Sequence, residues 1–400
     1  MADKEKTERV RPIWRSVLIL VVALAVGGFA SVGFMRQRIR EPYVNGPGVT
    51  KVRHLSDYLP SLKGETASDA PIWFLEGAQP GATILIYQSH PCEPAAMLQQ
   101  LLLLERAKVN AGRVIVIPDT VYSGKEDLQP GVGFPERYHI VQPDGGVRWF
   151  RMGGRMTAQR LQWPLPTIAT NYPSGQTLAD LEALNLNRTM PGRANGTLTE
   201  RIAFAVVELM RQEHVDMVID NHEAPPDRPL VEAVCAASNS MEIAANAIMN
   251  MELDYGVQWR LEASPPSLRG LSHQEIPRVL PNVQVFLMET ASPMHGPLRG
   301  LATEDLLLTG KDPNELRAAQ MGRVFCKYDE NGKPLQQRLG YKMAFLQGLQ
   351  EAWNDAHPDK PLDIGNVPTY DELVANGIGP YLAKVTEPEP WQYLVSSKLF

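Results

Sequence analysis

The stretch SHPCEP at residues 89–94 follows an apolar run, ATILIY at residues 82–87, and precedes a helical pattern that begins at Ala95. Its His90 and Glu93 lie three residues apart, in the turn that leaves a predicted strand. An imidazole nitrogen and a carboxylate at this spacing can bind one metal ion, and a catalytic zinc takes three protein ligands plus an open position for water. The pair by itself also fits a surface turn with an incidental histidine. A metal site therefore needs a third ligand from elsewhere in the chain.

The composition is that of an ordinary globular protein, with 400 residues, 44% of them hydrophobic and 21% charged. This length is enough for one large domain or two small ones with a substantial core. The formal charge of -6 argues against nucleic acid as the main partner, because phosphate binding needs clustered positive charge. The three cysteines, Cys92, Cys235 and Cys326, form no disulfide framework and say little about the compartment.

The amino-terminal end carries an uncharged run at residues 17–35 with basic residues on both sides. Its length is close to the roughly 20 apolar residues that span a bilayer. We predict a transmembrane signal anchor there, after a basic tail at residues 1–16, with a cleaved signal peptide and a buried helix as the alternatives. The short tail favours the cytoplasmic side. The chain is therefore predicted to be a single-pass protein of the cell membrane whose large domain lies outside the cytoplasm, in the periplasm.

Residues 36–68 contain many Gly, Pro and polar residues and are predicted to form a linker. A globular domain is predicted to follow at residues 69–355. In it, apolar strands predicted at 82–87 and 113–118 flank a helix predicted at 94–109. This order of elements is typical of a parallel crossover unit, which predicts an α/β fold.

Two further buried strands are predicted at residues 215–220 and 283–288, with a long helix at 230–251 between them. A Gly- and Pro-rich segment at 119–197 interrupts the regular pattern. Irregular segments of this length inside a compact domain are usually functional. Residues 356–400 are Pro-rich and are predicted to be a C-terminal extension.

Four candidate functional side chains follow predicted strands. His90 and Glu93 leave one strand, His222 leaves another and Glu289 leaves a third. In open α/β sheets, ligands bind in the crevice beyond the carboxyl ends of the strands. Each of these residues, taken singly, also fits an ordinary loop or surface position. Their shared placement predicts that all four meet at one edge of the sheet.

A fifth feature is the stretch NLNRTMPG at residues 185–192, within the irregular segment. An arginine pairs bidentately with a carboxylate, and a neighbouring amide can add hydrogen bonds. Beside a metal ion, Asn187 and Arg188 would hold a substrate carboxylate and orient the bond to be cleaved.

In this order, the HxxE motif, the Asn–Arg pair, the later His and the still later Glu resemble the zinc carboxypeptidase-like superfamily, and in particular its succinylglutamate desuccinylase/aspartoacylase branch. The motifs cover residues 84–293. The resemblance implies an α/β fold with a mixed, largely parallel sheet and helices on both faces. It also implies one zinc ion and a role for each of six residues: His90, Glu93 and His222 as zinc ligands, Asn187 and Arg188 as substrate ligands, and Glu289 as general acid/base.

The sequence departs from the family pattern at several positions. Pro91 and Cys92 stand where the family commonly has Gly or Asn, and Asn185 stands where it commonly has Asp. Cys92 is either a further zinc ligand or a small side chain packed under the loop, and Asp220 is a candidate to orient His222. The family arginine that polarises the substrate carbonyl has three candidates here: Arg151, Arg155 and Arg160.

Together these features predict a membrane-anchored zinc-dependent hydrolase that cleaves an amide bond in a carboxylate-bearing substrate, with metal-activated water and Glu289 as general base. A small N-acyl amino acid, as for a deacylase, and a short peptide, as for a metallopeptidase, are equal alternatives for the substrate. The second partner is the lipid bilayer, through residues 17–35. The alternative function is a catalytically silent family member that acts as a membrane-tethered binding or scaffold subunit.

Overall fold

The computed structural model describes residues 13–36, 39–64, 67–126, 135–165, 168–263 and 268–385. The chain divides into two compact units. One contains the helix α1 (Ile13–Arg36), and the other spans Glu41–Val385.

The helix α1 is long and apolar, and residues Ile13–Gly33 have a mean hydropathy of 2.3. The predicted anchor at residues 17–35 falls within it, whereas residues 1–12 of the predicted tail lie outside the described residues. Its length and composition suit a membrane span, since about 20 helical residues cross the hydrocarbon core. A signal sequence near the N-terminus has the same properties.

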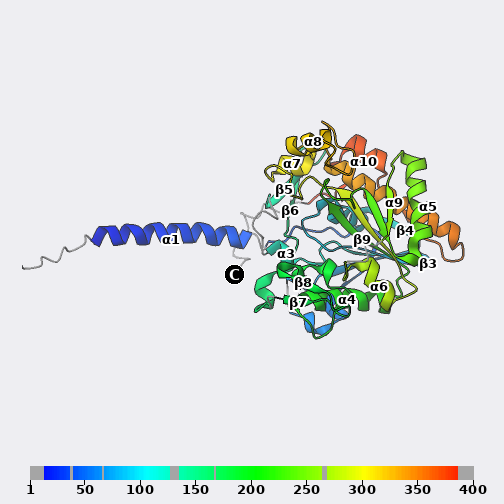
Figure 1. Ribbon diagram of the computed structural model, residues 1–400, viewed down its shortest axis with the longest axis horizontal. Helices are drawn as coiled ribbons and strands as arrows, with labels where there is room; N and C mark the ends of the chain where they lie inside the picture. Colours follow the sequence, from blue (N-terminus) through cyan, green and yellow to red (C-terminus); the bar gives the residue numbers. More distant parts are fainter. Residues whose placement is uncertain are drawn as a thin grey trace, which may run out of the picture. The chain divides into compact units, whose positions relative to one another are not determined.

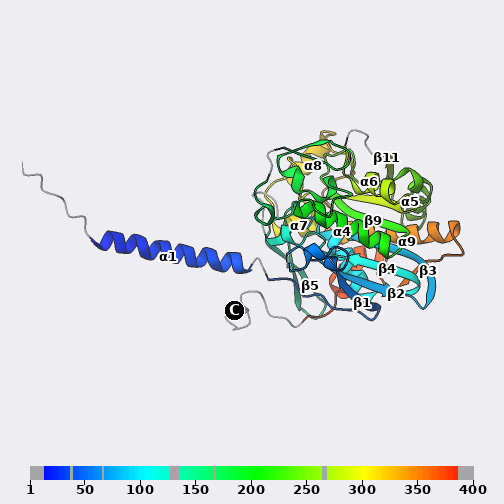
Figure 2. The ribbon, with the colours of Figure 1, turned by 90° about the horizontal axis from the view of Figure 1, so that it is seen from below.

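A nine-stranded sheet forms the centre of the second unit (Figure 1), in the order β1-β2-β4-β3-β9-β12-β10-β11 with β13 paired to β4. The pairs β3–β4, β3–β9, β9–β12 and β10–β11 are parallel, and the other four pairs are antiparallel. Figure 2 shows β1, β2, β4 and β3 together at one side of the sheet. The nine strands are β1 (Val49–His54), β2 (Pro71–Glu76), β3 (Gln79–Gln88), β4 (Lys108–Ile117), β9 (Met217–Ala224), β10 (Ala233–Ala236), β11 (Arg260–Ala263), β12 (Gln284–Ala291) and β13 (Asp363–Gly365).

Helices cover both faces of the sheet. On one face α2 (Pro94–Arg106), α5 (Met241–Tyr255) and α9 (Leu335–Ala356) pack against the sheet, and on the other α4 (Leu198–Gln212) and α6 (Ser272–Val279) do so. The apolar run of β3 is continuous because alternate side chains serve the two cores: Ile84 and Ile86 face the first, and Leu85 and Tyr87 the second. The predicted α/β fold, with a mixed, largely parallel sheet and helices on both faces, is confirmed.

Smaller elements complete the unit. Two hairpins, β5–β6 and β7–β8, and several short helices stand outside the central sheet. Their bounds are β5 (Arg137–Val141), β6 (Val147–Arg151), β7 (Ile168–Thr170), β8 (Thr177–Ala179), α3 (Ser123–Glu126), α7 (Glu304–Thr309), α8 (Pro313–Gln320) and α10 (Tyr370–Asn376), with the 3-10 helices η4 (Asp180–Leu184) and η5 (Leu186–Arg188) in the irregular segment.

The predicted domain boundaries are wrong at both ends. Within the supposed linker 36–68, β1 pairs antiparallel with β2 and Leu55 is fully buried. The polar composition suggested a linker because β1 is an outer strand that buries little of its surface. Within the supposed extension 356–400, β13 pairs with β4 and α10 packs on α9. The compact unit therefore runs from Glu41 to Val385 rather than over residues 69–355.

Candidate metal centre

Three predicted ligands meet at the carboxyl ends of two neighbouring parallel strands. His90 and Glu93 follow β3, and His222 lies near the end of β9, the parallel neighbour of β3. All three side chains are buried, and their ligand atoms lie within 4.8 Å of one another. The sheet thus joins residues that are up to 132 positions apart in the chain.

The separations of the ligand atoms suit a tetrahedral ion. His90 Nδ1 lies 2.8 Å from Glu93 Oε1 and 3.1 Å from His222 Nδ1, and His222 Nδ1 lies 3.3 Å from Glu93 Oε2. Zinc–ligand bonds of about 2.0–2.1 Å at tetrahedral angles place neighbouring ligand atoms about 3.3 Å apart. Glu93 Oε2 is buried, with His222 Nδ1 at 3.3 Å as a charged neighbour, and a bound cation would offset the cost of burying this oxygen. Two imidazoles and one carboxylate therefore fit zinc.

The hydrogen bonds around His90 determine which ring nitrogen faces the ion. Asn185 Nδ2 lies 3.1 Å from Glu182 Oε2, and because a carboxylate only accepts, the amide nitrogen donates there. Asn185 Oδ1, on the other side, lies 2.8 Å from His90 Nε2, which therefore donates to it. This leaves the lone pair of His90 Nδ1 directed at Glu93 and His222.

The surroundings of His222 produce the same result. Its Nε2 lies 3.1 Å from Asp220 Oδ1, so this nitrogen donates and Nδ1 faces the site. Asp220 also accepts from the hydroxyls of Ser89, at 3.1 Å, and Ser272, at 2.6 Å. Burial opposes ionisation of Asp220, but the charge and hydrogen bond of His222 lower its pKa below the usual range. Asp220 is thus placed to orient the imidazole of His222, as predicted.

A proton competes with the cation at this site. Burial lowers the pKa of His222, but the charges of Asp220 and Glu93 outweigh burial and raise it to about 10. This favours a protonated His222 in the metal-free protein, and a cation bound at Nδ1 would have to displace that proton. Metal binding is expected to release this proton, so affinity for the ion rises with pH.

The turn that carries His90 packs against a glycine. Gly153 N donates to Pro91 O at 3.2 Å, and a Cβ on Gly153 would come within 2.3 Å of Pro91 Cβ. Cys92 is buried in the same turn but does not belong to the ligand cluster. Burial raises the pKa of its thiol, so the sulfur stays protonated and packed, which is the second of the two alternatives stated for it.

Two buried cations from α9 support the strand that carries His222. Lys342 Nζ donates to His222 O at 2.8 Å, and Arg338 Nη1 donates to both carboxylate oxygens of Glu223 at 3.0 Å. Both cations are fully buried. Burial lowers the pKa of Lys342 to about 8, against the opposing charges of Glu223, Glu93 and Glu289. The two positive charges offset carboxylates that would otherwise repel one another.

A cavity of about 700 Å³ opens beside the ligands, large enough for a small organic molecule. Its walls come from the irregular segment, from the loop after β9 and from the residues that follow β12. His295 and the acids Glu93, Glu182, Glu223 and Glu289 line it. Four arginines also line it: Arg155, Arg188, Arg228 and Arg299.

Glu289 reaches this cavity from β12, where it lies opposite His222 of the parallel strand β9. Its Oε2 atom is buried and makes no hydrogen bond within the described residues. Burial and the charge of Glu93 raise its pKa to about 7, while His222, Arg155 and Lys342 limit the rise. A carboxylate with a pKa near 7 can both take up and release a proton in the neutral range.

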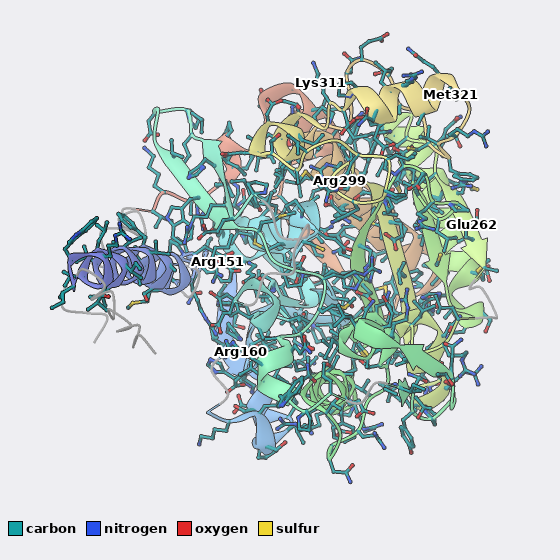
Figure 3. The ribbon with its side chains drawn as sticks, turned by 60° about the vertical axis from the view of Figure 1, so that its left-hand side comes forward. Arg151, Arg160, Glu262, Arg299, Lys311 and Met321 are labelled. Carbon is teal, nitrogen blue, oxygen red and sulfur yellow. The ribbon has the colours of Figure 1, made fainter. Side chains whose placement is uncertain are left out.

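Among the three arginine candidates, Arg155 is the one that lines the cavity. Arg151 is buried and donates to Tyr122 Oη at 2.9 Å, and Arg160 pairs with Glu126 at 2.8 Å. Figure 3 shows Arg151 and Arg160 at a distance from Arg299, which lines the cavity. Arg155 Nε is buried without a hydrogen-bond partner in the described residues, so this donor remains for a ligand.

The two predicted substrate ligands differ in placement. Arg188 lines the cavity, and its Nε lies 3.2 Å from Glu182 Oε2. Asn187 is buried instead: its Oδ1 accepts from Ser272 N at 3.2 Å, and its Nδ2 lies 3.3 Å from His222 Nε2. The role of Asn187 as a substrate ligand stays a prediction, and in the structure it packs beside a metal ligand.

A buried histidine near the site is expected to make the fold sensitive to acid. His273 is buried and neither ring nitrogen is hydrogen-bonded within the described residues. Burial lowers its pKa to about 4, although the charge of Asp220 raises it. In the unfolded chain the pKa of a histidine is about 6.5. Above pH 6.5 His273 is therefore neutral in both states, and the free energy of unfolding falls by up to about 3 kcal/mol as the pH drops from 6.5 toward 4.

Urea unfolding at several pH values tests this expectation. His273→Gln should unfold with a shallower loss of stability between pH 6.5 and 4 than the unaltered chain. Parallel curves for the two proteins would show that His273 is not responsible.

Comparisons with known proteins give similar solved structures at low sequence identity. A metallo-carboxypeptidase from Burkholderia cenocepacia is 12% identical over 82% of this chain and 69% of its own, with a TM-score of 0.41. The tripeptide-bound cell shape determinant Csd4 from Helicobacter pylori is 11% identical over 76% and 59%, with a TM-score of 0.41. A succinylglutamate desuccinylase/aspartoacylase from Rhodobacter sphaeroides is 14% identical over 57% and 54%, with a TM-score of 0.34.

These structures thus include a metallo-carboxypeptidase and a succinylglutamate desuccinylase/aspartoacylase. The chain spans little more than half the length of the second and third proteins. No protein-family model matches the chain, and no curated protein matches it.

Proposed function

We propose that this chain is a zinc-dependent hydrolase that cleaves an amide bond in a carboxylate-bearing substrate. The observation that carries the proposal is the direction of two ring nitrogens. His90 Nδ1 and His222 Nδ1 lie 3.1 Å apart with Glu93 beside both, and hydrogen bonds on the far side of each ring leave the Nδ1 lone pairs for a cation.

Zinc held by His90, Glu93 and His222 would supply a Lewis acid for the substrate carbonyl and lower the pKa of a water molecule toward about 7. Glu289 takes a proton from the attacking water, and the water oxygen forms a bond to the carbonyl carbon. Glu289 then passes the proton to the amide nitrogen as the carbon–nitrogen bond breaks, which yields a carboxylate and an amine. A group that must exchange protons in both directions works best with a pKa close to the working pH, as for Glu289.

Two arginines position the substrate in this proposal. Arg155 Nε has no hydrogen-bond partner in the part of the chain that the structure describes, and it lines the same cavity as Glu289, where it can stabilise the negative charge that develops on the carbonyl oxygen. Arg188 lines the same cavity and pairs with the substrate carboxylate. A small N-acyl amino acid and a short peptide both satisfy this arrangement.

Turnover of a substrate panel tests the proposal. The purified protein, loaded with zinc, should release amine from members of a set of N-acyl amino acids and short peptides with free carboxylates. A protein that binds zinc at the three ligands but hydrolyses none of them would support the alternative, a catalytically silent binding subunit.

We also propose that α1 anchors the chain in the cell membrane with the second unit outside the cytoplasm. The length and hydropathy of Ile13–Gly33 support a span. Fractionation with carbonate washing tests it, because an anchored chain stays in the membrane pellet and a processed one becomes soluble.

Arg188→Ala is expected to raise KM for carboxylate-bearing substrates about 10- to 100-fold, the loss expected for a charge-assisted hydrogen-bonded pair. The kcat should fall much less, because Arg188 contacts neither the water nor the leaving nitrogen in the proposed scheme. Steady-state kinetics on an acid substrate and on its neutral amide give the test. An equal change for both substrates would remove Arg188 as the carboxylate ligand.

A further inference from the structure

One carboxylate oxygen at the rim of the cavity links the candidate metal centre to the substrate arginine. Glu182 Oε2 accepts from Asn185 Nδ2 at 3.1 Å and lies 3.2 Å from Arg188 Nε. Asn185 Oδ1 accepts in turn from His90 Nε2. Glu182 is thus connected to the candidate ligand His90 through the side-chain amide of Asn185, and it also contacts Arg188 directly.

Both the oxygen and the nitrogen of the Asn185 side-chain amide are hydrogen-bonded. Its Oδ1 receives two donors, His90 Nε2 at 2.8 Å and Asn187 N at 3.0 Å, which uses both lone pairs. Glu182 and the backbone N–H of Asn187 together fix the orientation of this amide, because a flipped amide would place its oxygen against the carboxylate and its nitrogen against two N–H donors. Without Glu182, Asn185 Oδ1 would keep its bond from Asn187 N, but the negative charge that faces Asn185 Nδ2 would be lost.

The chain folds locally so that these groups meet. Glu182 lies in η4 (Asp180–Leu184), and Asn185 is the N-cap of η5 (Leu186–Arg188), where its side chain accepts from the backbone N–H of Asn187. Asn185, whose backbone is extended, is the one residue between the two short helices, and Glu182 contacts both Asn185 and Arg188 across this turn.

We propose that Glu182 is a positioning residue for the metal centre, and that it supplies through Asn185 the negative charge that orients His90. The inference rests on the proposed metal site. The neutral Asn185 and the acidic Glu182 form a matched pair, because two carboxylates at this separation would repel one another. A metal-binding imidazole is commonly oriented by a hydrogen-bonded acceptor, and such partners matter to metal affinity about 10- to 100-fold.

Exchanging the carboxylate at position 182 with the amide at position 185 tests this proposal. Glu182→Gln is expected to weaken Zn2+ binding about 10-fold, because the negative charge behind the Asn185 amide is lost. The double variant N185D/E182Q restores one carboxylate and one amide in exchanged positions, and its affinity is expected within about threefold of the unaltered chain. The single variant Asn185→Asp places two carboxylates together and should bind Zn2+ more weakly than the double variant.

The measurement is competition for Zn2+ between the metal-free full-length protein and a zinc-binding chromophore. Glu208→Gln is the matched control, since Glu208 also pairs with an arginine, Arg211, but on the surface of α4. Arg188→Ala is the second control and should change Zn2+ affinity less than threefold, which separates the effect on His90 from that on the substrate arginine. Thermal unfolding of the metal-free proteins checks the fold; the Glu182 side chain is 41% exposed, so its replacement opens no cavity.

Three outcomes are distinguishable. A 10-fold loss in Glu182→Gln that the double variant recovers supports the inference. Equal affinity of Glu182→Gln and Glu208→Gln overturns it while the metal site stands, and so does a loss that the double variant leaves in place. If the unaltered chain binds no Zn2+, the proposed metal site fails first, and the inference fails with it.

Discussion

Glu289→Gln is expected to lower kcat about 100- to 10,000-fold, the range that general acid–base catalysis contributes. The amide of glutamine has nearly the shape of the carboxylate but cannot take a proton from water at neutral pH. Glu289 is placed for this role by β12, whose register sets it opposite His222, and by burial, which raises its pKa to about 7. The loss should fall on kcat more than on KM, because the proton moves only as bonds change.

The Zn2+ content of this variant decides how the result is interpreted. Glu289 is outside the cluster of three ligands, so Glu289→Gln should bind Zn2+ with an affinity close to that of the unaltered chain. Glu242→Gln, an exposed change in the first turn of α5, serves as the matched control. Full turnover of Glu289→Gln with normal zinc content would show that another group moves the proton.

Removal of one metal ligand has the second large expected effect. His222→Ala leaves two ligands on the His90 turn and should weaken Zn2+ binding by more than the roughly 100-fold that loss of a hydrogen-bond partner of a metal ligand costs. Turnover should fall to background, since neither the carbonyl nor the water is then activated. Asp220→Asn keeps the ligand and changes only its partner, so its loss of affinity should be intermediate, about 10- to 100-fold.

Chelation provides the same test without a substitution. Dialysis of the unaltered protein against a chelator should abolish turnover, and added Zn2+ should restore it. Turnover that survives complete removal of the metal, or His222→Ala with unchanged zinc affinity, would contradict the assignment of the three ligands.

The residues at the strand ends could be predicted because two general rules apply to them. Continuous apolar runs identify the buried strands, and the carboxyl ends of parallel strands share one edge of a sheet. His90, Glu93, His222 and Glu289 all follow from these rules, although His222 and Glu289 lie within the last residues of their strands rather than beyond them.

The supporting residues could not be predicted in the same way. Glu182 acts through the path of two short 3-10 helices in an irregular segment, for which no sequence period exists. Lys342 and Arg338 come from α9, more than 100 positions after His222, and nothing in a charged residue's sequence context shows that it will be fully buried. Likewise, the sequence does not distinguish Arg151, Arg155 and Arg160, and only the fold shows that Arg155 lines the cavity.

Two errors in the fold have local causes. The predicted helix at residues 230–251 begins instead as β10, a strand of four residues that precedes the good helix formers of α5. The strand is set by pairing with both β11 and β12, which are distant in sequence. The linker prediction failed because β1 buries so little of its surface that it lacks the alternating pattern of a half-buried strand.

Anomalous diffraction at the zinc absorption edge, from crystals of the protein grown with Zn2+, tests the central claim most directly. We expect one peak bonded to His90 Nδ1, His222 Nδ1 and the carboxylate of Glu93, at about 2.0–2.2 Å from each. Absence of a peak between these side chains, or bonding through the Nε2 atoms, would contradict the account.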